Sequence, residues 1–251
     1  MDRALLQRVL TLYGRKPVLE TLADSTLECH ALHLAQSNRD SGIIKELVAS
    51  AARRNIPTHR HTRTELSRIS KNGKQDQGVA LDVICPNFKT LGDHLAQLAQ
   101  QPQARLIALD AITNPQNLGM IIRSAAAGAI DAILLPSKGC AALGPLVIKA
   151  SAGTLFKAPI VRCTTLTEAL TDYKNAGARI CTLEGNARDS LFNHRESNFT
   201  IYVLGNETRG VSKASSALAD HRLTIPMRHG VESLNVAVAA SLIAFSPYFE
   251  R

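Results

Sequence analysis

Apolar residues follow two alternating patterns from about residue 105 onward. Short aliphatic runs predict strands, and longer stretches with apolar residues every three or four positions predict helices. The expected strands are Arg105–Leu109, Ala132–Leu135, Pro159–Arg162, Arg179–Leu183, Thr200–Leu204 and Arg222–Ile225, and the expected helices lie near Leu118–Gly128, Pro145–Ala150, Leu166–Gly177, Ser212–Ala219 and Asn235–Phe245. Regular alternation predicts an α/β fold with a parallel sheet covered on both faces. Ligands of such sheets bind beyond the carboxyl ends of the strands.

The chain before this region predicts a smaller α/β unit. Its expected helices are Arg15–Ala23 and Ile43–Arg54, and its expected strands are Glu28–Leu34 and Gly78–Ile84. Thr62 followed by Glu65 has the spacing of a capping box for a short helix. The segment Cys85–Thr90 has the composition of a linker. We therefore predict a first domain over 1–86, a linker and first helix over 87–104, and a second domain over 105–251.

Composition indicates an ordinary globular protein, with 45% hydrophobic and 20% charged residues. No apolar run approaches the roughly 20 residues that span a bilayer, and the N-terminus lacks the pattern of a secretory signal. The five cysteines are scattered without a disulfide or zinc spacing, which favours reduced thiols. We expect a cytoplasmic protein with no membrane partner and no metal.

The formal charge of +8 points to a polyanionic partner. Seven Lys or Arg between Arg53 and Lys74 face a single acid, Glu65, which is consistent equally with a solvated face and with an RNA-phosphate patch. The RNA candidates in this cluster are Arg53, Arg54, Arg60, Arg63, Arg68 and Lys71. His59 and His61 form an H-x-H pair, but no further ligand is near and metal binding is disfavoured. The absence of Trp disfavours single-strand binding by base stacking.

Three loops after predicted strands carry the candidate chemistry. In NPQNLGMIIRS, ending at Ser124, Asn117 is expected to cap a helix, and Arg123 beside the helix start would form an anion site. In GNETRGVS, two glycines bracket Glu207, the functional candidate, whose alternative role is a surface charge or helix cap. In IPMRHGVESLNVAVAAS, Ser233 and Asn235 flank Leu234 where the final helix begins. No G-x-G-x-x-G and no P-loop accompanies them, which weighs against nucleotide-binding classes such as a nicotinamide oxidoreductase.

Together and in this order, the three segments resemble the motifs of the SpoU (TrmH-type) RNA 2′-O-ribose methyltransferases of the SPOUT superfamily. The resemblance covers Leu106–Phe245 and includes the intervening KASAGTLFKAPI. More loosely, the first unit resembles the ribosomal-protein-like RNA-binding domain of many members, through Tyr13-Gly14 and QGVALDV. The resemblance implies a trefoil knot, a homodimer in which the final helix takes part, and S-adenosyl-L-methionine as cofactor.

By the same resemblance, specific positions are expected to carry the reaction. The implied catalytic residues are Asn117, Arg123, Glu207, Ser233 and Asn235. The implied cofactor-binding residues are Leu183, Glu184, Gly185, Leu204, Gly205, Asn206, Ile225, Met227 and Leu234. Arg123 is expected to grip a phosphate and stabilise the developing alkoxide, because a guanidinium does not deprotonate in proteins. Glu207 is expected to orient either Arg123 or Asn117.

The target is expected to be structured RNA, with ribosomal RNA favoured over transfer RNA and the nucleotide left undefined. A tRNA 2′-O-methyltransferase and a non-catalytic RNA-binding or ribosome-assembly protein are the alternatives. The sequence departs from the family pattern at Thr208, where Gly is frequent, at Ala237, where Ser is frequent, and in the SPYFER ending. None of these departures removes a matched polar residue, although the last is expected to affect the dimer contact.

Overall fold

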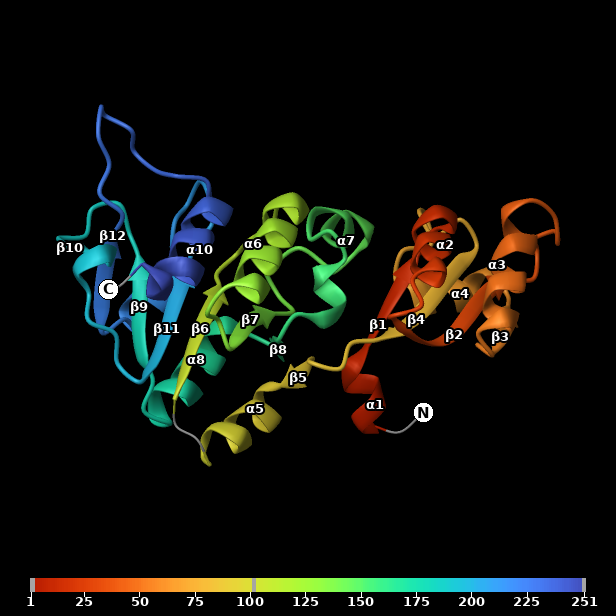
Figure 1. Cartoon of the computed structure of the whole chain (residues 1–251), viewed down its shortest axis with the longest axis horizontal. Coiled ribbons are helices and arrows are strands. Elements are labelled where there is room, and N and C mark those ends of the chain that lie inside the picture. The colour runs from red at the N-terminus through yellow and green to blue at the C-terminus, as the bar shows by residue number, and fades with distance from the viewer. Residues whose placement is uncertain (1–2, 101–102, 250–251) are drawn as a thin grey trace. The chain divides into compact units, whose positions relative to one another are not determined.

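A computed structural model describes residues 3–100 and 103–249 (Figure 1). The chain folds as two compact units that divide between Pro86 and Asn87, with the short segment Leu143–Pro145 grouped with the first. Each unit is described separately below. Of the expected elements, all eleven of the second domain and all four of the first are present, most with bounds shifted by one to three residues.

The first unit is a four-stranded mixed sheet with helices packed on it. In chain order its elements are α1 (Arg3–Arg8), β1 (Val9–Tyr13), α2 (Arg15–Ala23), β2 (Glu28–Ala35), α3 (Ile43–Arg53), β3 (Thr58–His61), α4 (Arg63–Ser70) and β4 (Val79–Ile84). The strand order is β1-β4-β2-β3, with β4 antiparallel to both neighbours and β2 parallel to β3. The capping box is confirmed: the Thr62 hydroxyl accepts from the Glu65 N–H, and the Glu65 carboxylate accepts from the Thr62 N–H.

The second unit is built on a parallel sheet of eight strands among the described residues. Its strands are β5 (Lys89–Thr90), β6 (Ala104–Leu109), β7 (Ala132–Pro136), β8 (Ile160–Cys163), β9 (Arg179–Leu183), β10 (Asp189–Ser190), β11 (Phe199–Leu204) and β12 (His221–Thr224). Its helices are α5 (Leu91–Leu98), α6 (Pro115–Ala127), α7 (Pro145–Ala150), α8 (Leu166–Asn175), α9 (Lys213–Ala217) and α10 (Val236–Phe245). The 3₁₀ turns are Thr154–Lys157, Leu191–Asn193 and Ser246–Tyr248.

Helices cover both faces of this sheet, as predicted. On one face α5 and α8 bury residues such as Leu98, Leu170 and Tyr173 against the strands. On the other face α6 and α10 pack against each other (Figure 1). A 2.8 Å hydrogen bond between the hydroxyls of Ser241 and Ser124 joins these two helices. The strands between them are buried on both sides, which explains their continuous apolar runs.

The strand order places the sheet's switch point between two particular strands. The order is β10-β12-β9-β11-β6-β7-β8-β5. The strands that follow β6 in the chain, β7 and β8, lie on one side of the β6–β11 pair, and β9 and β12 lie on the other side. The central strands β6 and β11 pair in parallel from Phe199 opposite Ala104 to Leu204 opposite Leu109. The loops that follow them therefore leave the sheet side by side, where ligands of open α/β sheets bind.

Some local expectations were wrong. Helix α6 begins at Pro115 and is capped by Asn114, whose side chain accepts from the N–H groups of Gln116 and Asn117. Asn117 is therefore inside the first turn and is not the cap, because Pro115 fits the first helical position and places the cap before it. The end of the predicted linker forms the edge strand β5. The trefoil knot stays a prediction. No helix among the described residues is long and apolar enough to cross a membrane.

Candidate functional site

The loop after β11 is a tight structure organised by Asn206. Its side-chain oxygen accepts from the N–H groups of Thr208 and Arg209, at 3.0 and 3.2 Å. Its amide nitrogen donates to the carbonyl of Ala111 at 2.9 Å, which ties this loop to the one that follows β6. Gly205 has no room for a side chain, since a Cβ there would lie 2.1 Å from the carbonyl carbon of Gly210. The glycines of this motif therefore permit a close backbone approach.

A chain of three side chains joins the three predicted motifs. The Asn117 amide nitrogen donates to Glu207 Oε1, and the Asn235 amide nitrogen donates to Asn117 Oδ1 at 3.1 Å. Asn235 Oδ1 accepts from the N–H of Ala237 at 2.8 Å and so caps α10. Asn117 is buried, with 6% of its surface exposed. The site expected beyond the strand ends is thus assembled from α6, the β11 loop and the start of α10.

Of the two partners predicted for Glu207, the structure shows Asn117. Arg123 lies six positions along α6 from Asn117, which is about 120° around the helix at about 100° per residue. It is exposed and has no hydrogen bond or ion pair with any residue in the described part of the chain. Ser233 is likewise exposed. Arg123 therefore presents an unused guanidinium to solvent instead of facing the Asn117–Glu207 pair.

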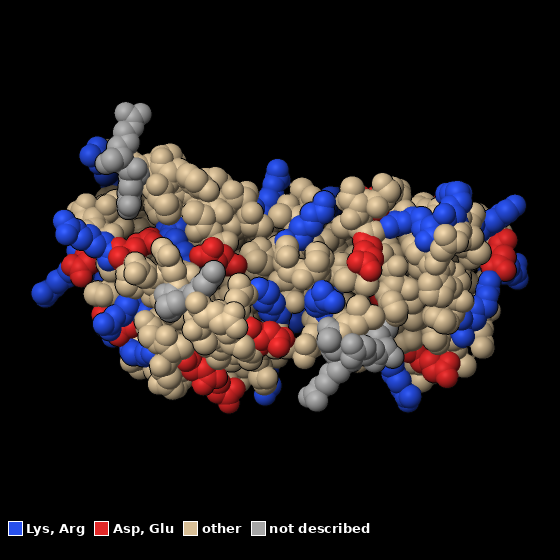
Figure 2. All heavy atoms as spheres, turned by 60° about the horizontal axis from the view of Figure 1, so that its bottom comes forward, with Lys and Arg blue, Asp and Glu red and all other residues tan. Residues whose placement is uncertain are grey.

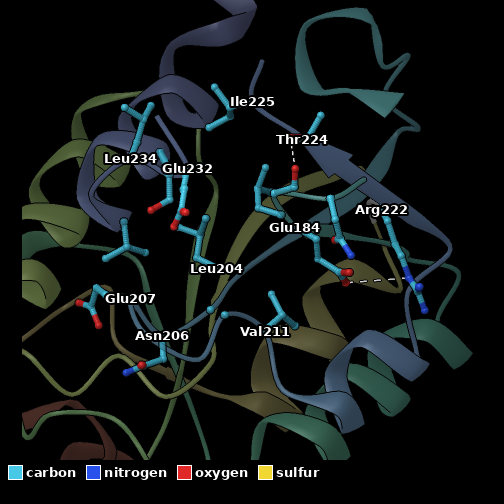
Figure 3. A pocket seen from close by; sticks show the side chains of 18 of the residues that line it. Glu184, Leu204, Asn206, Glu207, Val211, Arg222, Thr224, Ile225, Glu232 and Leu234 are labelled. Atoms are coloured by element: carbon cyan, nitrogen blue, oxygen red, sulfur yellow. Dashed lines mark hydrogen bonds and ion pairs between the residues drawn. The ribbon is translucent and has the colours of Figure 1, made fainter. Parts of the chain in front are cut away.

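A cavity of about 1060 Å³ opens at the carboxyl ends of β9, β11 and β12 (Figure 3). All nine residues predicted to bind the cofactor line it, together with Glu207 and Ser233. Asn117, Arg123 and Asn235 are outside the lining. The residues that sequence reasoning missed include Arg209, Val211, Lys213, Ser216, Arg222 and Glu232. Several of them lie within or next to the matched motifs in the sequence, which could have indicated that they line the cavity. No spacing rule distinguishes them from other loop residues, however.

The cavity mixes apolar walls with unsatisfied main-chain groups. Leu183, Leu204 and Leu234 supply apolar surface. The backbone N–H groups of Met227 and Leu234 donate to no acceptor among the described residues. An adenosine joined through a sulfonium to an amino acid needs both kinds of surface, because its base is flat and apolar while its edges carry donors and acceptors. The residues present therefore fit S-adenosylmethionine.

The basic residues of the first unit have unequal roles. The Arg54 guanidinium donates to the carbonyls of Leu22, Asp24 and Leu27, so this residue has a structural role, and its contact with RNA stays a prediction. Arg60 forms a 2.5 Å ion pair with Asp40. The side chains of Arg53, Arg63, Arg68 and Lys71 are exposed. Basic and acidic side chains are interspersed on the face drawn in Figure 2, so the positive excess is not confined to one patch there.

One member of the H-x-H pair, His61, belongs to a hydrogen-bonded chain across the first sheet. His61 Nε2 lies 3.0 Å from His33 Nδ1, and His33 Nε2 lies 3.2 Å from Asp82 Oδ2. Burial alone would raise the pKa of Asp82, but hydrogen bonds from His33 and Thr11 outweigh it and hold that pKa low. Burial, followed by the charge of His33, lowers the pKa of His61. No group of three or more His, Cys, Asp or Glu suited to a metal ion occurs among the described residues.

Comparisons with known proteins cover both units. The profile described as SpoU rRNA Methylase family matches residues 104–245, and the profile described as RNA 2′-O ribose methyltransferase substrate binding matches residues 11–88. An uncharacterized tRNA/rRNA methyltransferase from Mycobacterium ulcerans (strain Agy99) is 34% identical over 233 residues, covering 93% of this chain and 74% of the relative.

Two solved structures show the same fold. A putative RNA methyltransferase of the TrmH family from Porphyromonas gingivalis superposes with a TM-score of 0.61 at 25% identity, covering 97% of this chain and 91% of the other. An AdoMet-bound rRNA methyltransferase from Sinorhizobium meliloti superposes with a TM-score of 0.63 at 22% identity, covering 95% of this chain and 86% of the other. Both likenesses extend over the two units described above.

Proposed function

Because this chain belongs to the SpoU rRNA Methylase family, whose members use S-adenosylmethionine, we propose that it methylates a ribose 2′-hydroxyl of structured RNA. The observation that carries the proposal is the Glu207–Asn117–Asn235 chain of hydrogen bonds. It gathers polar groups from three separate loops beside a cavity that all nine predicted cofactor residues line. A fold kept only for RNA binding would not require that arrangement.

The cofactor supplies an electrophilic methyl group on a sulfonium. The protein must then align the acceptor hydroxyl and help its proton to leave, and no metal is required for either task. Asn117 and Asn235 hold Glu207 in one orientation at the edge of the cavity. Ser233, also at that edge, positions the ribose. These residues therefore fix the geometry of the acceptor.

Arg123 is assigned to the phosphate beside the reacting ribose. Its guanidinium offers a planar set of donors suited to a phosphate and stabilises the alkoxide that develops as the proton leaves. Because it is exposed on α6 and does not line the cavity of its own chain, RNA reaches it along the exposed side of α6 or across a subunit contact.

We assign a homodimer to account for this placement. Each of α6 and α10 carries an exposed apolar side chain, Met120 with 40% and Val238 with 47% of its surface exposed. An exposed apolar face on two adjoining helices favours association with a second copy. Such a contact would bring Arg123 of one subunit toward the other subunit.

Ribosomal RNA is the proposed target. The first unit matches a substrate-binding domain of RNA 2′-O ribose methyltransferases and exposes Arg53, Arg63, Arg68 and Lys71. Phosphate contacts by such residues position an RNA without reading its sequence. All five cysteines are free thiols, which is in keeping with a reaction in the cytoplasm.

The test incubates the purified chain and S-adenosylmethionine with RNA from cells that lack the gene. Ribosomal RNA and transfer RNA are tested in separate reactions. Nucleoside mass spectrometry after digestion is expected to show a new 2′-O-methylated nucleoside in ribosomal RNA alone. Methylation in transfer RNA alone would support the alternative substrate. Binding of ribosomal RNA without methylation or cofactor binding would support the non-catalytic alternative.

A further inference from the structure

One wall of the cavity carries a pair of opposite charges. Glu184 follows β9 and Arg222 lies in β12, and both line the cavity on the side away from Glu207 in Figure 3. Arg222 Nε lies 3.9 Å from Glu184 Oε1. The pair is therefore within Coulombic reach but too far apart for a hydrogen bond at that contact.

The carboxylate of Glu184 is held in place from one side. The hydroxyls of Thr182 and Ser216 both donate to its Oε1, each at 2.8 Å. Its backbone N–H donates to the carbonyl of Leu223 at 2.9 Å, and its side chain is only 19% exposed. Among the described residues no hydrogen bond reaches Oε2. One oxygen of a fixed anion is thus left to accept from a ligand.

Arg222 is a nearly unused cation at the same wall. Its side chain is 60% exposed, and Glu184 is its sole ion-pair partner in the described part of the chain. A guanidinium has five N–H donors and no acceptor. Most of these donors are therefore available to an anionic group that enters the cavity.

A fixed anion with a cation beside it matches one ligand chemistry best. An α-amino acid carries an ammonium and a carboxylate on the same carbon, so each charge meets its opposite. An RNA phosphate would be repelled by Glu184, and a neutral ribose diol would leave Arg222 without a role. Charge-assisted contacts of this kind are stronger than neutral ones.

We propose that Glu184 and Arg222 form the subsite for the amino-acid end of the cofactor, with Glu184 accepting from the ammonium and Arg222 donating to the carboxylate. The inference rests on the proposed use of S-adenosylmethionine. Glu184 and Arg222 would then select ligands that carry both the ammonium and the carboxylate. This role is in binding and is not part of methyl transfer.

The test compares two ligands by isothermal titration of the full chain. S-adenosylhomocysteine carries the amino-acid end, and 5′-methylthioadenosine has the same nucleoside without it. Glu184→Gln and Arg222→Gln are each expected to weaken S-adenosylhomocysteine binding about tenfold or more, which is the order expected for a charge-assisted hydrogen bond. Binding of 5′-methylthioadenosine is expected to change less than about twofold, because it makes no contact with either group.

Lys213→Gln is the matched control. Lys213 also lines the cavity and is a cation, but it has no acidic partner within 4 Å among the described residues. This variant is expected to keep the wild-type ratio of the two affinities. Thermal unfolding checks each variant, and Glu184→Asp replaces Glu184→Gln if the latter does not fold.

The outcomes separate this inference from the proposed function. Equal weakening of both ligands would overturn the subsite, since it would indicate a contact with the nucleoside or a structural role. If only Lys213→Gln weakened S-adenosylhomocysteine binding relative to 5′-methylthioadenosine binding, the carboxylate would be assigned to Lys213. That result would overturn the role of Arg222. A wild-type chain that binds neither ligand would contradict the proposed function itself.

Discussion

The Asn117 side chain donates a hydrogen bond to Glu207 across 90 positions of sequence. Its amide oxygen accepts from Asn235, so the two ends of this amide are not interchangeable. A reversed amide would set its oxygen against the Glu207 carboxylate. The hydrogen-bond network therefore fixes both the rotamer of Asn117 and the position of the carboxylate beside the cavity.

Asn117→Asp replaces the donor with a second carboxylate next to Glu207. Repulsion and loss of the hydrogen bond are expected to reduce turnover by about tenfold to a hundredfold. Affinity for S-adenosylhomocysteine is expected to stay near the wild-type value, because Asn117 does not line the cavity. Methyl-transfer assays and calorimetry measure the two quantities. Asn175→Asp makes the same chemical change at an exposed position of α8 and is the control; an equal loss of turnover there would contradict the specific role of Asn117.

Arg123→Lys keeps a positive charge but removes the bidentate geometry of the guanidinium. Turnover is expected to fall by at least about a hundredfold, the order seen when one donor to a developing oxyanion is removed. Cofactor affinity is expected to be unchanged, since Arg123 is not among the residues that line the cavity. Wild-type turnover in this variant would remove Arg123 from the reaction.

Two glycines of the cavity form a matched pair for substitution. Gly205→Ala would place a methyl group 2.1 Å from a backbone carbon of Gly210, so the loop must shift. We expect a loss of affinity for S-adenosylhomocysteine of about tenfold or more, equivalent to the 1–3 kcal/mol of an overpacking change. Gly185→Ala meets only the Glu232 carbonyl, at 3.6 Å, and is expected to bind nearly normally. Equal effects of the two substitutions on binding would contradict the steric explanation.

A buried ion pair lies at the opposite end of the central strands. Arg105 donates to both carboxylate oxygens of Glu196, and the Tyr202 hydroxyl donates to the same carboxylate. Glu196→Gln removes the partner of the Arg105 guanidinium, whose side chain is only 10% exposed. The substitution is expected to lower the free energy of unfolding by about 2–4 kcal/mol. Arg179→Gln, which breaks an exposed 3.8 Å pair with Asp220, is expected to cost less than about 1 kcal/mol. Urea denaturation measures both.

The stability of the second unit is expected to depend on His94. Burial, and then the charge of Lys89, lowers its pKa from 6.5 to about 4, and the Tyr173 hydroxyl lies 2.6 Å from its Nδ1. The unfolded chain takes up this proton first, so the stabilisation is complete above pH 6.5 and is lost as the pH falls toward 4. About 2 kcal/mol should be lost between pH 7 and pH 5. Urea titrations of wild type and His94→Gln at both values check this, and an identical pH dependence would contradict it.

The regular part of the fold was predictable because it is local. Strands such as Arg179–Leu183 and helices such as Pro145–Ala150 have the predicted bounds, since buried strands and amphipathic helices leave distinct periodic patterns. The cap of α6 was misplaced by three residues: Asn114 and Asn117 are both favoured cap residues, and the preference of Pro115 for the first helical position favours Asn114. Two-residue edge strands such as Lys89–Thr90 are too short to leave a pattern.

The site was predictable in its residues but not in its contacts. Resemblance supplied Asn117, Glu207 and Asn235, yet their hydrogen bonds depend on the adjacency of β6 and β11, which no local pattern encodes. Arg54 shows the opposite case, because a charge in a basic cluster turned out to bind three backbone carbonyls. The Glu184–Arg222 pair could not be predicted either, because it depends on the pairing of β9 with β12, which are not consecutive in the chain.

The central pairing of the second sheet also bears on how the protein acquires its cavity. Leu109 of β6 lies opposite Leu204 of β11, so the middle of the sheet forms only after a long loop has closed. Closing a long loop costs entropy before its contacts are made, and sheets of high contact order fold slowly for this reason. The cavity at the carboxyl ends of β9, β11 and β12 is therefore expected to form late in folding, so a ligand that needs it stabilises the folded sheet without accelerating its formation.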